Sequence, residues 1–174
     1  MPPNASLCKT NFREKYVYHQ IHPLKLFTGV GAARKMGNVT FAIKAAVGDP
    51  RVKTFTFNAQ KTMYGGKHIA KGDTIFVFAS ENEGGPGLIA SGVVTSARAI
   101  AKKRGIARQT PRVSITVRRA ALVKRRLGRS ELRFFSDWND GRPETELNFK
   151  FYRQATNKIV GISDGAAAFL RRFF

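Results

Sequence analysis

The chain has 174 residues, 43% of them hydrophobic, with 31 Lys and Arg against 11 Asp and Glu and a formal net charge of +20. This length favours one domain with a real core, and the absence of a run of about 20 apolar residues argues against a membrane-spanning helix. The positive excess favours an anionic partner, for which nucleic acid is the first candidate; the alternative is a solvated cationic surface without a specific ligand.

The N-terminal part of the chain differs from the rest. Residues 1–38 contain scattered basic residues and no sustained period, apart from a short apolar run at Tyr16–Ile21. They are expected to form an N-terminal arm, packed on the domain or partly disordered, with residues 39–174 as the domain itself. The single Cys8 cannot form an internal disulfide and Met1–Ala5 lacks a signal-peptide pattern, so a cytoplasmic protein is expected.

Short strands dominate the first half of the domain. Val39–Val47 and Val52–Phe57 have the composition of strands, and Gln60–Tyr64 is expected to form a helical turn. The turn Lys71–Asp73 leads into the apolar run Thr74–Ser80. A tip rich in Gly and Pro then connects this run to a second one, Leu88–Ala97, so the two runs are predicted to form a hairpin.

A basic block follows the hairpin. Residues 98–133 carry thirteen of the 31 cationic side chains and only one acidic residue, Glu131. Val113–Val117 alternates as a half-buried strand does, Ala99–Ile106 is predicted to be a connecting loop, and Ala120–Leu127 is either helical or a continuation of the strand.

The C-terminal segment mixes turns, strands and one helix. Ser136–Pro143 is a dense turn cluster. Leu147–Tyr152 alternates and is predicted to be a strand that pairs with Lys158–Ile162. Ser163 is a good N-cap for a helix that ends at Phe173. Many short strands with one or two helices predict an α+β domain around a mostly antiparallel sheet or small barrel.

Three segments resemble the PUA-like superfamily, with ASCH and EVE domains most similar: Gln60-Lys61-Thr62, Lys67–Asp73 with the strand that follows, and Ser91–Val94. The resemblance covers roughly residues 39–97. It implies an open β-barrel of mostly antiparallel strands with flanking short helices. It also implies a pocket for one base, often a modified one, in RNA or DNA.

Some ASCH domains are amidohydrolases that act on acylated nucleosides with a Lys and a nearby Glu. The matching segment here, Lys61–Gly66, lacks the acid and has Tyr64 near its place. This departure favours a binding module with no catalytic residues. The alternatives are a nucleoside or RNA hydrolase centred on Lys61 with Asp137 or Asp140, and a structural protein of a ribonucleoprotein particle.

Trp138 is the only tryptophan and lies in a polar turn, where it is either a stacking platform for a base or a core anchor beside Phe134 and Phe135. Asp137 and Asp140 beside it are interpreted as turn-capping residues, with a catalytic pair as the alternative. The base pocket is predicted to contain Lys61, Tyr64, Phe78, Ser80, Trp138, Asn139, Asp140, Tyr152 and Arg153.

The basic block is predicted to follow a phosphate backbone, with RNA favoured over DNA as the partner. His19, His22 and His68 lack the accompanying ligands of a metal site, and neither a metal nor a cofactor is expected. The predicted phosphate-binding residues are Lys67, Lys71, Arg98, Lys102, Lys103, Arg104, Arg118, Arg119, Lys124, Arg125 and Arg126.

Overall fold

The computed structural model describes residues 40–153 and 157–174. The predicted arm 1–38, with Cys8, His19 and His22, lies outside these residues. Six strands form in the described part: β1 (Thr40–Ala45), β2 (Thr54–Met63), β3 (Thr74–Ala79), β4 (Gly87–Ile100), β5 (Arg112–Leu122) and β6 (Lys158–Ile162). The hairpin predicted from the Lys71–Asp73 turn onward is confirmed as β3 and β4, and the predicted strands at β1, β5 and β6 are confirmed as well.

The strands close into a barrel in the order β1-β3-β4-β5-β2-β6. The expected α+β barrel is confirmed, but it is closed rather than open and mixed rather than mostly antiparallel. β1 pairs with β3, and β2 with β6, in parallel, while the other four pairings are antiparallel. The parallel pairing of β2 with β6 closes the barrel, because it brings the end of β2 beside a strand almost 100 residues later in the chain.

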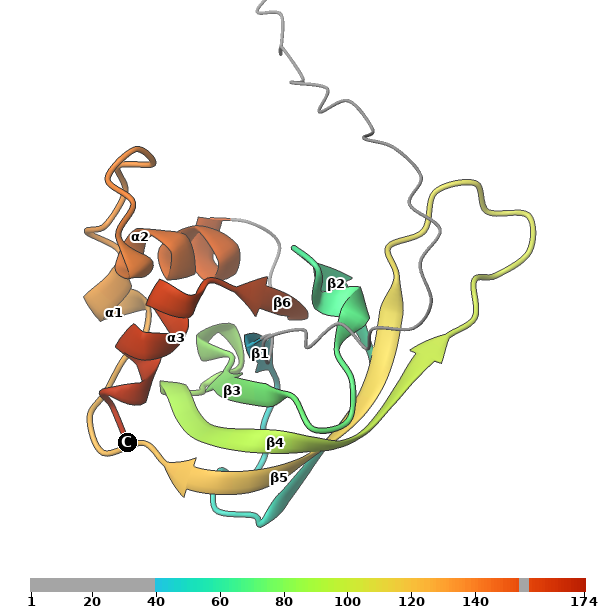
Figure 1. The fold of residues 1–174 in the computed structure, drawn as a ribbon, viewed down its shortest axis with the longest axis horizontal. Helices are drawn as coiled ribbons and strands as arrows, with labels where there is room; N and C mark the ends of the chain where they lie inside the picture. The colour runs from blue at the N-terminus through green and yellow to red at the C-terminus, as the bar shows by residue number, and fades with distance from the viewer. Residues whose placement is uncertain (1–39, 154–156) are drawn as a thin grey trace, which may run out of the picture. The chain divides into compact units, whose positions relative to one another are not determined.

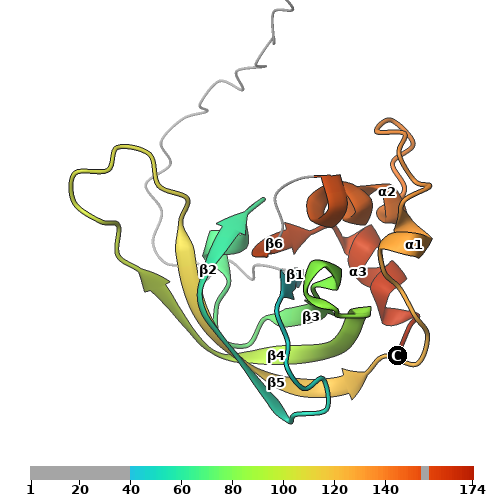
Figure 2. The same ribbon diagram turned by 180° about the vertical axis from the view of Figure 1, so that it is seen from behind.

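Two apolar cores hold the domain together. The first fills the barrel with inward side chains that include Phe41, Phe57, Ile75 and Ile115. The second lies between the barrel and the helices, and Phe78 and Phe151 meet there with ring centroids 4.9 Å apart. Helices α1 (Arg129–Leu132), α2 (Pro143–Asn148) and α3 (Asp164–Arg171) lie on the side of the barrel away from the β4–β5 hairpin loop (Figures 1 and 2).

The predicted strand at Leu147–Tyr152 is wrong. Pro143 begins α2, and the chain continues through the π-helix η3 (Phe149–Arg153). Leu147 and Phe151 are four residues apart, so they share a helical face and are both fully buried. Phe149, which a strand would place on the same face as Phe151, is only partly buried. Lys158–Ile162 consequently pairs with β1 and β2 and not with residues 147–152.

Two further boundaries differ from the prediction or decide between alternatives. Gln60–Tyr64 is not helical, because β2 passes through a bulge near Ala59 and continues to Met63, and the 3-10 helix η1 (Gly66–His68) follows. Of the two alternatives for Ala120–Leu127, the structure has the continued strand, since residues 120–122 belong to β5. Ser163 caps α3 as predicted, since its hydroxyl accepts a hydrogen bond from the Ala166 amide at 3.1 Å. In the described residues, no helix combines the length and apolar character needed to cross a bilayer.

Candidate functional site

An aromatic pocket of about 290 Å³ opens where the end of β2 meets α2 and η3. The Trp138 and Phe149 rings meet edge-on, with centroids 3.5 Å apart and an interplanar angle of 88°. The Tyr64 ring lies 6.3 Å from that of Phe149. Trp138 is 48% exposed and Tyr64 39%, so both rings retain surface for a ligand. The pocket is lined by Tyr64, Trp138, Asp140, Gly141, Arg142, Thr145, Glu146, Phe149 and Lys150.

The loop that carries Trp138 is fixed by the two carboxylates beside it. Asp137 Oδ1 accepts a hydrogen bond from the Asn139 amide at 3.1 Å. Asp140 accepts from the Arg142 amide and from the Thr145 hydroxyl, both at 2.8 Å. The Arg142 amide and the Thr145 hydroxyl hold the pKa of Asp140 below its usual range. Both carboxylates therefore stabilise the turn and the start of α2, as interpreted from the sequence.

A partly buried ion pair forms one side of the aromatic pocket. Lys150 Nζ donates to Glu146 Oε1 at 2.7 Å and to the Gly161 carbonyl at 2.8 Å, and it lies 5.1 Å from the centre of the Tyr64 ring. Burial alone would raise the pKa of Glu146, but hydrogen bonds from Lys150 and from the Ser163 hydroxyl and amide outweigh it and lower the pKa. Glu146 is thus ionised at neutral pH and offers a fixed hydrogen-bond acceptor.

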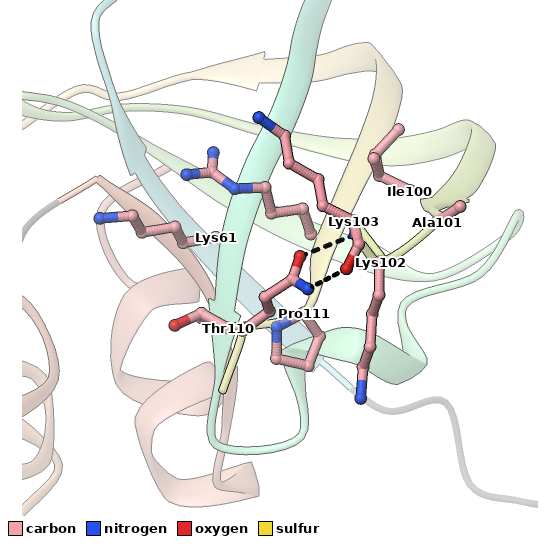
Figure 3. Close-up of a pocket in the computed structure, with 9 residues that line it drawn as sticks. Lys61, Ile100, Ala101, Lys102, Lys103, Thr110 and Pro111 are labelled. Carbon is pink, nitrogen blue, oxygen red and sulfur yellow. Dashed lines mark hydrogen bonds between the residues drawn. The ribbon is translucent and has the colours of Figure 1, made fainter. Parts of the chain in front are cut away.

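A second pocket, a cationic cleft of about 300 Å³, lies between β2 and the base of the β4–β5 hairpin (Figure 3). Strand register places Lys61 beside Arg112 and Arg112 beside Ile100, so these side chains share one face of three neighbouring strands. Lys102 and Lys103 leave the hairpin in opposite directions (Figure 3). The lining contains four cations and no carboxylate: Lys61, Ile100, Ala101, Lys102, Lys103, Gln109, Thr110, Pro111 and Arg112.

The end of β2 connects the two pockets. Lys61 lines the cationic cleft, Met63 is 37% exposed in a depression under the hairpin loop, and Tyr64 lines the aromatic pocket. Three extended residues span about 10 Å, which is the reach of a few nucleotides along a strand. One polymer could therefore touch both pockets at once.

A buried polar cluster lies apart from both pockets. Lys44 is fully buried in β1, with its Nζ 3.7 Å from Glu81 Oε2 and 4.1 Å from the centre of the Tyr152 ring. Burial lowers the pKa of Lys44, against the attraction of Glu81, and raises that of Tyr152. Within the described part of the chain, the Ser80 Oγ and Tyr152 Oη atoms have no hydrogen-bond partner. The signal for this cluster was a lysine inside the apolar run of β1, which sequence reasoning missed.

The structure divides the predicted base pocket among several places. Tyr64, Trp138 and Asp140 share the aromatic pocket, whereas Lys61 lines the cationic cleft. Ser80 and Tyr152 lie in or beside the Lys44 cluster, and Phe78 is a core residue. Asn139 and Arg153 are exposed and line neither pocket. Phe149 and Lys150 were missed because the segment Leu147–Tyr152 was interpreted as a strand, which gave them the wrong directions. Glu146, which precedes that segment, was not chosen either.

The predicted phosphate-binding residues also separate into groups. Arg98, Lys102, Lys103 and Arg104 lie on the exposed β4–β5 hairpin, and Lys67, Lys71 and Arg118 are exposed elsewhere. Lys124 is likewise exposed beyond β5.

Several of the remaining arginines make structural contacts. Arg119 donates to the backbone carbonyls of Pro50 and Arg51. Arg125 donates to the Arg172 carbonyl at 2.7 Å and lies over the Phe173 ring. Arg126 lies 3.7 Å from Glu131. Arg119 and Arg125 thus tie distant parts of the backbone together, and Arg126 forms an exposed ion pair. Lys61 joins the hairpin residues as a candidate phosphate ligand, as does Arg112, which also donates to the Ala59 carbonyl at 2.7 Å. Among the described residues, no three His, Cys, Asp or Glu side chains group as metal ligands would.

Comparison with family models and with curated proteins finds no match. Solved structures do match. The human THYN1 protein in complex with 5-methylcytosine-containing DNA aligns with a TM-score of 0.53 at 13% identity, covering 76% of this chain and 95% of that one. The DUF55 domain of human thymocyte nuclear protein 1 gives 0.52 at 14% identity, covering 75% and 95%. A hypothetical protein from Leishmania major gives 0.50 at 15% identity, covering 77% and 92%.

The chain has a PUA-like fold. The resemblance to the PUA-like superfamily, and to EVE domains within it, is thereby confirmed at the level of the fold. At 13 to 15% identity the shared fold does not show which ligand this chain binds. What this PUA-like domain binds must be argued from its own pockets.

Proposed function

We propose that this PUA-like domain binds nucleic acid, holding one base in the aromatic pocket and the neighbouring phosphates in the cationic cleft. The observation that carries the proposal is that the two pockets lie at opposite ends of one four-residue segment, since Lys61 lines the cationic cleft and Tyr64 lines the aromatic pocket. Each nucleotide of a strand carries one phosphate and one base, and the length of this segment matches the reach of a few nucleotides. One strand laid along this edge can therefore place a base in the aromatic pocket and a phosphate in the cationic cleft.

The aromatic pocket suits a single planar ring system. Its volume of about 290 Å³ is at the small end of ligand sites. The exposed surfaces of Trp138 and Tyr64 offer stacking, which contributes about 1–3 kcal/mol per base. Glu146 and Asp140 line the pocket, and the lone pairs that their existing hydrogen bonds leave open can accept from the exocyclic amine of a base. A modified base is the natural first probe, because the structurally similar human THYN1 protein was solved with DNA containing 5-methylcytosine.

The cationic cleft suits the backbone. Four cations without an opposing carboxylate line it, so a phosphate entering the cleft meets only attraction. Such contacts fix the register of the strand and carry no sequence information, which leaves selectivity to the aromatic pocket. The RNA preference expected from the sequence remains a prediction, since nothing in either pocket distinguishes a ribose from a deoxyribose.

The geometry favours binding over the hydrolase alternative. Lys61 and Asp140 line different pockets, and Asp137 and Asp140 are both engaged in capping hydrogen bonds. It also favours a base-binding module over a purely structural ribonucleoprotein component, because a concave site exists beside Trp138.

Fluorescence anisotropy with labelled single-stranded oligonucleotides tests the proposal. The strands would contain cytosine, 5-methylcytosine or an abasic position at the centre, in DNA and in RNA, at two salt concentrations. Trp138→Ala is expected to lower affinity about 5- to 100-fold through lost stacking. Phe134→Ala is the matched control, because Phe134 is 72% exposed in the preceding loop and lines neither pocket. Binding that ignores both Trp138 and salt would refute the proposal.

A further inference from the structure

The loop between β4 and β5 has features that a base pocket does not need. Residues 101–111 connect the two strands and project beyond the barrel (Figures 1 and 2). The loop contains four cations and no acidic residue: Lys102, Lys103, Arg104 and Arg108. Near its tip Ile106 is 52% exposed, more than any other exposed large aliphatic side chain in the described part of the chain. An apolar side chain between cations, held away from any core, is suited to contact with a partner.

Hydrogen bonds within this loop fix its conformation. The Gln109 side chain accepts from the Lys103 amide at 2.9 Å and donates to the Lys103 carbonyl at 2.6 Å and to the Ile106 carbonyl at 3.0 Å. The Lys103–Gln109 pair appears as dashed lines in Figure 3. One side chain thus ties both arms of the loop and fixes the backbone at Ile106. A loop held in one shape loses less conformational entropy when it binds.

The base of the loop is equally well defined. β4 and β5 stay paired as far as Ile100 and Arg112. β3 leaves the edge of β4 near Val93, but β2 stays paired with β5 as far as Arg112, so only the two arms of the loop extend past the paired strands (Figures 1 and 2). The major groove of B-form DNA is about 12 Å wide and admits a two-stranded ribbon. The major groove of an A-form RNA duplex is deep and too narrow for side chains to read. The width of the major groove therefore decides which duplex can admit the loop: B-form DNA can, and A-form RNA cannot.

We infer that the loop Ala101–Pro111 enters the major groove of duplex DNA, with its cations toward the flanking phosphates and Ile106 against the methyl edge of a pyrimidine. The inference rests on the proposed function and names its substrate class, duplex DNA. Apolar side chains contact the methyl group of thymine in that groove. The same chain would then hold one base in the aromatic pocket and read the duplex beside it. This departs from the RNA partner expected from the sequence alone.

Three substrates of one sequence test the inference: duplex DNA, the single DNA strand, and duplex RNA. The wild-type protein is expected to bind duplex DNA at least tenfold more tightly than duplex RNA. Ile106→Ser should weaken duplex DNA binding about five- to tenfold, as expected when the exposed half of an isoleucine is no longer buried, and leave single-strand affinity unchanged. Gln109→Ala should act in the same direction by releasing the loop. Leu122→Ser is the control, since Leu122 is 41% exposed at the opposite end of β5.

The outcomes separate this inference from the proposed function. If Trp138→Ala weakens binding and Ile106→Ser leaves duplex binding unchanged, the loop inference is wrong and the base pocket stands. If Ile106→Ser weakens duplex binding and Trp138→Ala has no effect on any substrate, the loop inference stands and the base pocket fails. Equal losses on single and double strands, or equal wild-type affinity for DNA and RNA duplexes, would also overturn the loop inference.

Discussion

The Gly161 amide donates a hydrogen bond of 3.0 Å to the carbonyl oxygen of Tyr64, and this contact places the Tyr64 ring at the aromatic pocket. Tyr64 has a positive φ of 49°, so the chain turns sharply there after β2. A Cβ on residue 161 would lie 2.5 Å from the same oxygen, closer than van der Waals contact allows. β6 can therefore approach this turn only with glycine at the contact.

Gly161→Ala should lower the free energy of unfolding by about 1–3 kcal/mol, because backbone atoms must move to admit the methyl group. It should also weaken base binding by displacing Tyr64. Urea denaturation measures the first effect. Gly48→Ala is the control, since no heavy atom lies within 4 Å of a Cβ there, and its change should stay within about 0.5 kcal/mol. Equal tolerance at both positions would contradict the close approach of β6.

Acid should destabilise the domain through Glu146. Its pKa is lowered in the folded state by hydrogen bonds from Lys150 and Ser163, against the opposing effect of burial. The unfolded state takes up a proton first as pH falls below the ordinary value of 4.5, so the stabilisation is present above that pH and is lost as pH falls through the folded pKa.

The variant Glu146→Gln should therefore lose about 1–3 kcal/mol of unfolding free energy at pH 7 and less than that at pH 3. Glu144→Gln on the same helix is the control. Urea titrations of the three proteins at both pH values give the comparison. A loss at pH 3 as large as that at pH 7 would show that the Glu146 charge has no part in stabilising the site.

Alkali should stabilise the domain through Lys44. Burial lowers its pKa from the ordinary value of 10.5, so between the folded pKa and 10.5 the unfolded chain binds more protons than the native one. The free energy of unfolding therefore rises with pH in that window. Burial lowers the pKa of Lys158 as well, so the test is a difference between two proteins.

Lys44→Met should remove the part of the rise in unfolding free energy that comes from Lys44 and leave the part that comes from Lys158. Denaturation at intervals from pH 7 to pH 10 measures the difference in slope between the variant and the wild type. Identical slopes would show that Lys44 is not buried with Glu81 and Tyr152 as the structure has it.

Strands with a clear alternation or a long apolar run were predictable from the sequence, and so was the capped helix α3. β3 and β4 are bounded by the Lys71–Asp73 turn and a Gly-rich tip, which are strong local signals. The segment Leu147–Tyr152 misled because Phe149 and Phe151 also alternate, while the helical relation of Leu147 to Phe151 depends on the second core. A spacing of four residues, as between Leu147 and Phe151, fits both the strand period and the helix period over so short a stretch.

The candidate site was only partly predictable. Trp138 and Asp140 could be chosen from their turn, and Tyr64 from its place in the ASCH-like segment, and the structure brings the three together. Lys61 was placed with them because the resemblance to ASCH domains puts Lys61 and Tyr64 in one motif, but the pairing of β2 with β5 places Lys61 beside Arg112 and the hairpin. The closure of β2 on β6 joins the pockets, and pairing between such distant strands leaves no local signal.

Salt dependence should report the cationic cleft. Lys61→Gln and Arg112→Gln should each weaken binding to all sequences alike and reduce the slope of log affinity against log salt by roughly 1. Arg171→Gln is a charge-matched control, because Arg171 is exposed at the end of α3 and lines neither pocket. Anisotropy titrations at several salt concentrations between about 50 and 200 mM give the comparison. Equal slopes for the control and the cleft variants would place the phosphates elsewhere.

The central claim is that a base enters the aromatic pocket against Trp138, which is the only tryptophan of the chain. Its fluorescence therefore reports on the pocket without a label. Titration with an oligonucleotide containing 5-methylcytosine should quench the emission, and an otherwise identical strand with an abasic position there should bind with little quenching. Binding of both strands with unchanged tryptophan emission would contradict the account.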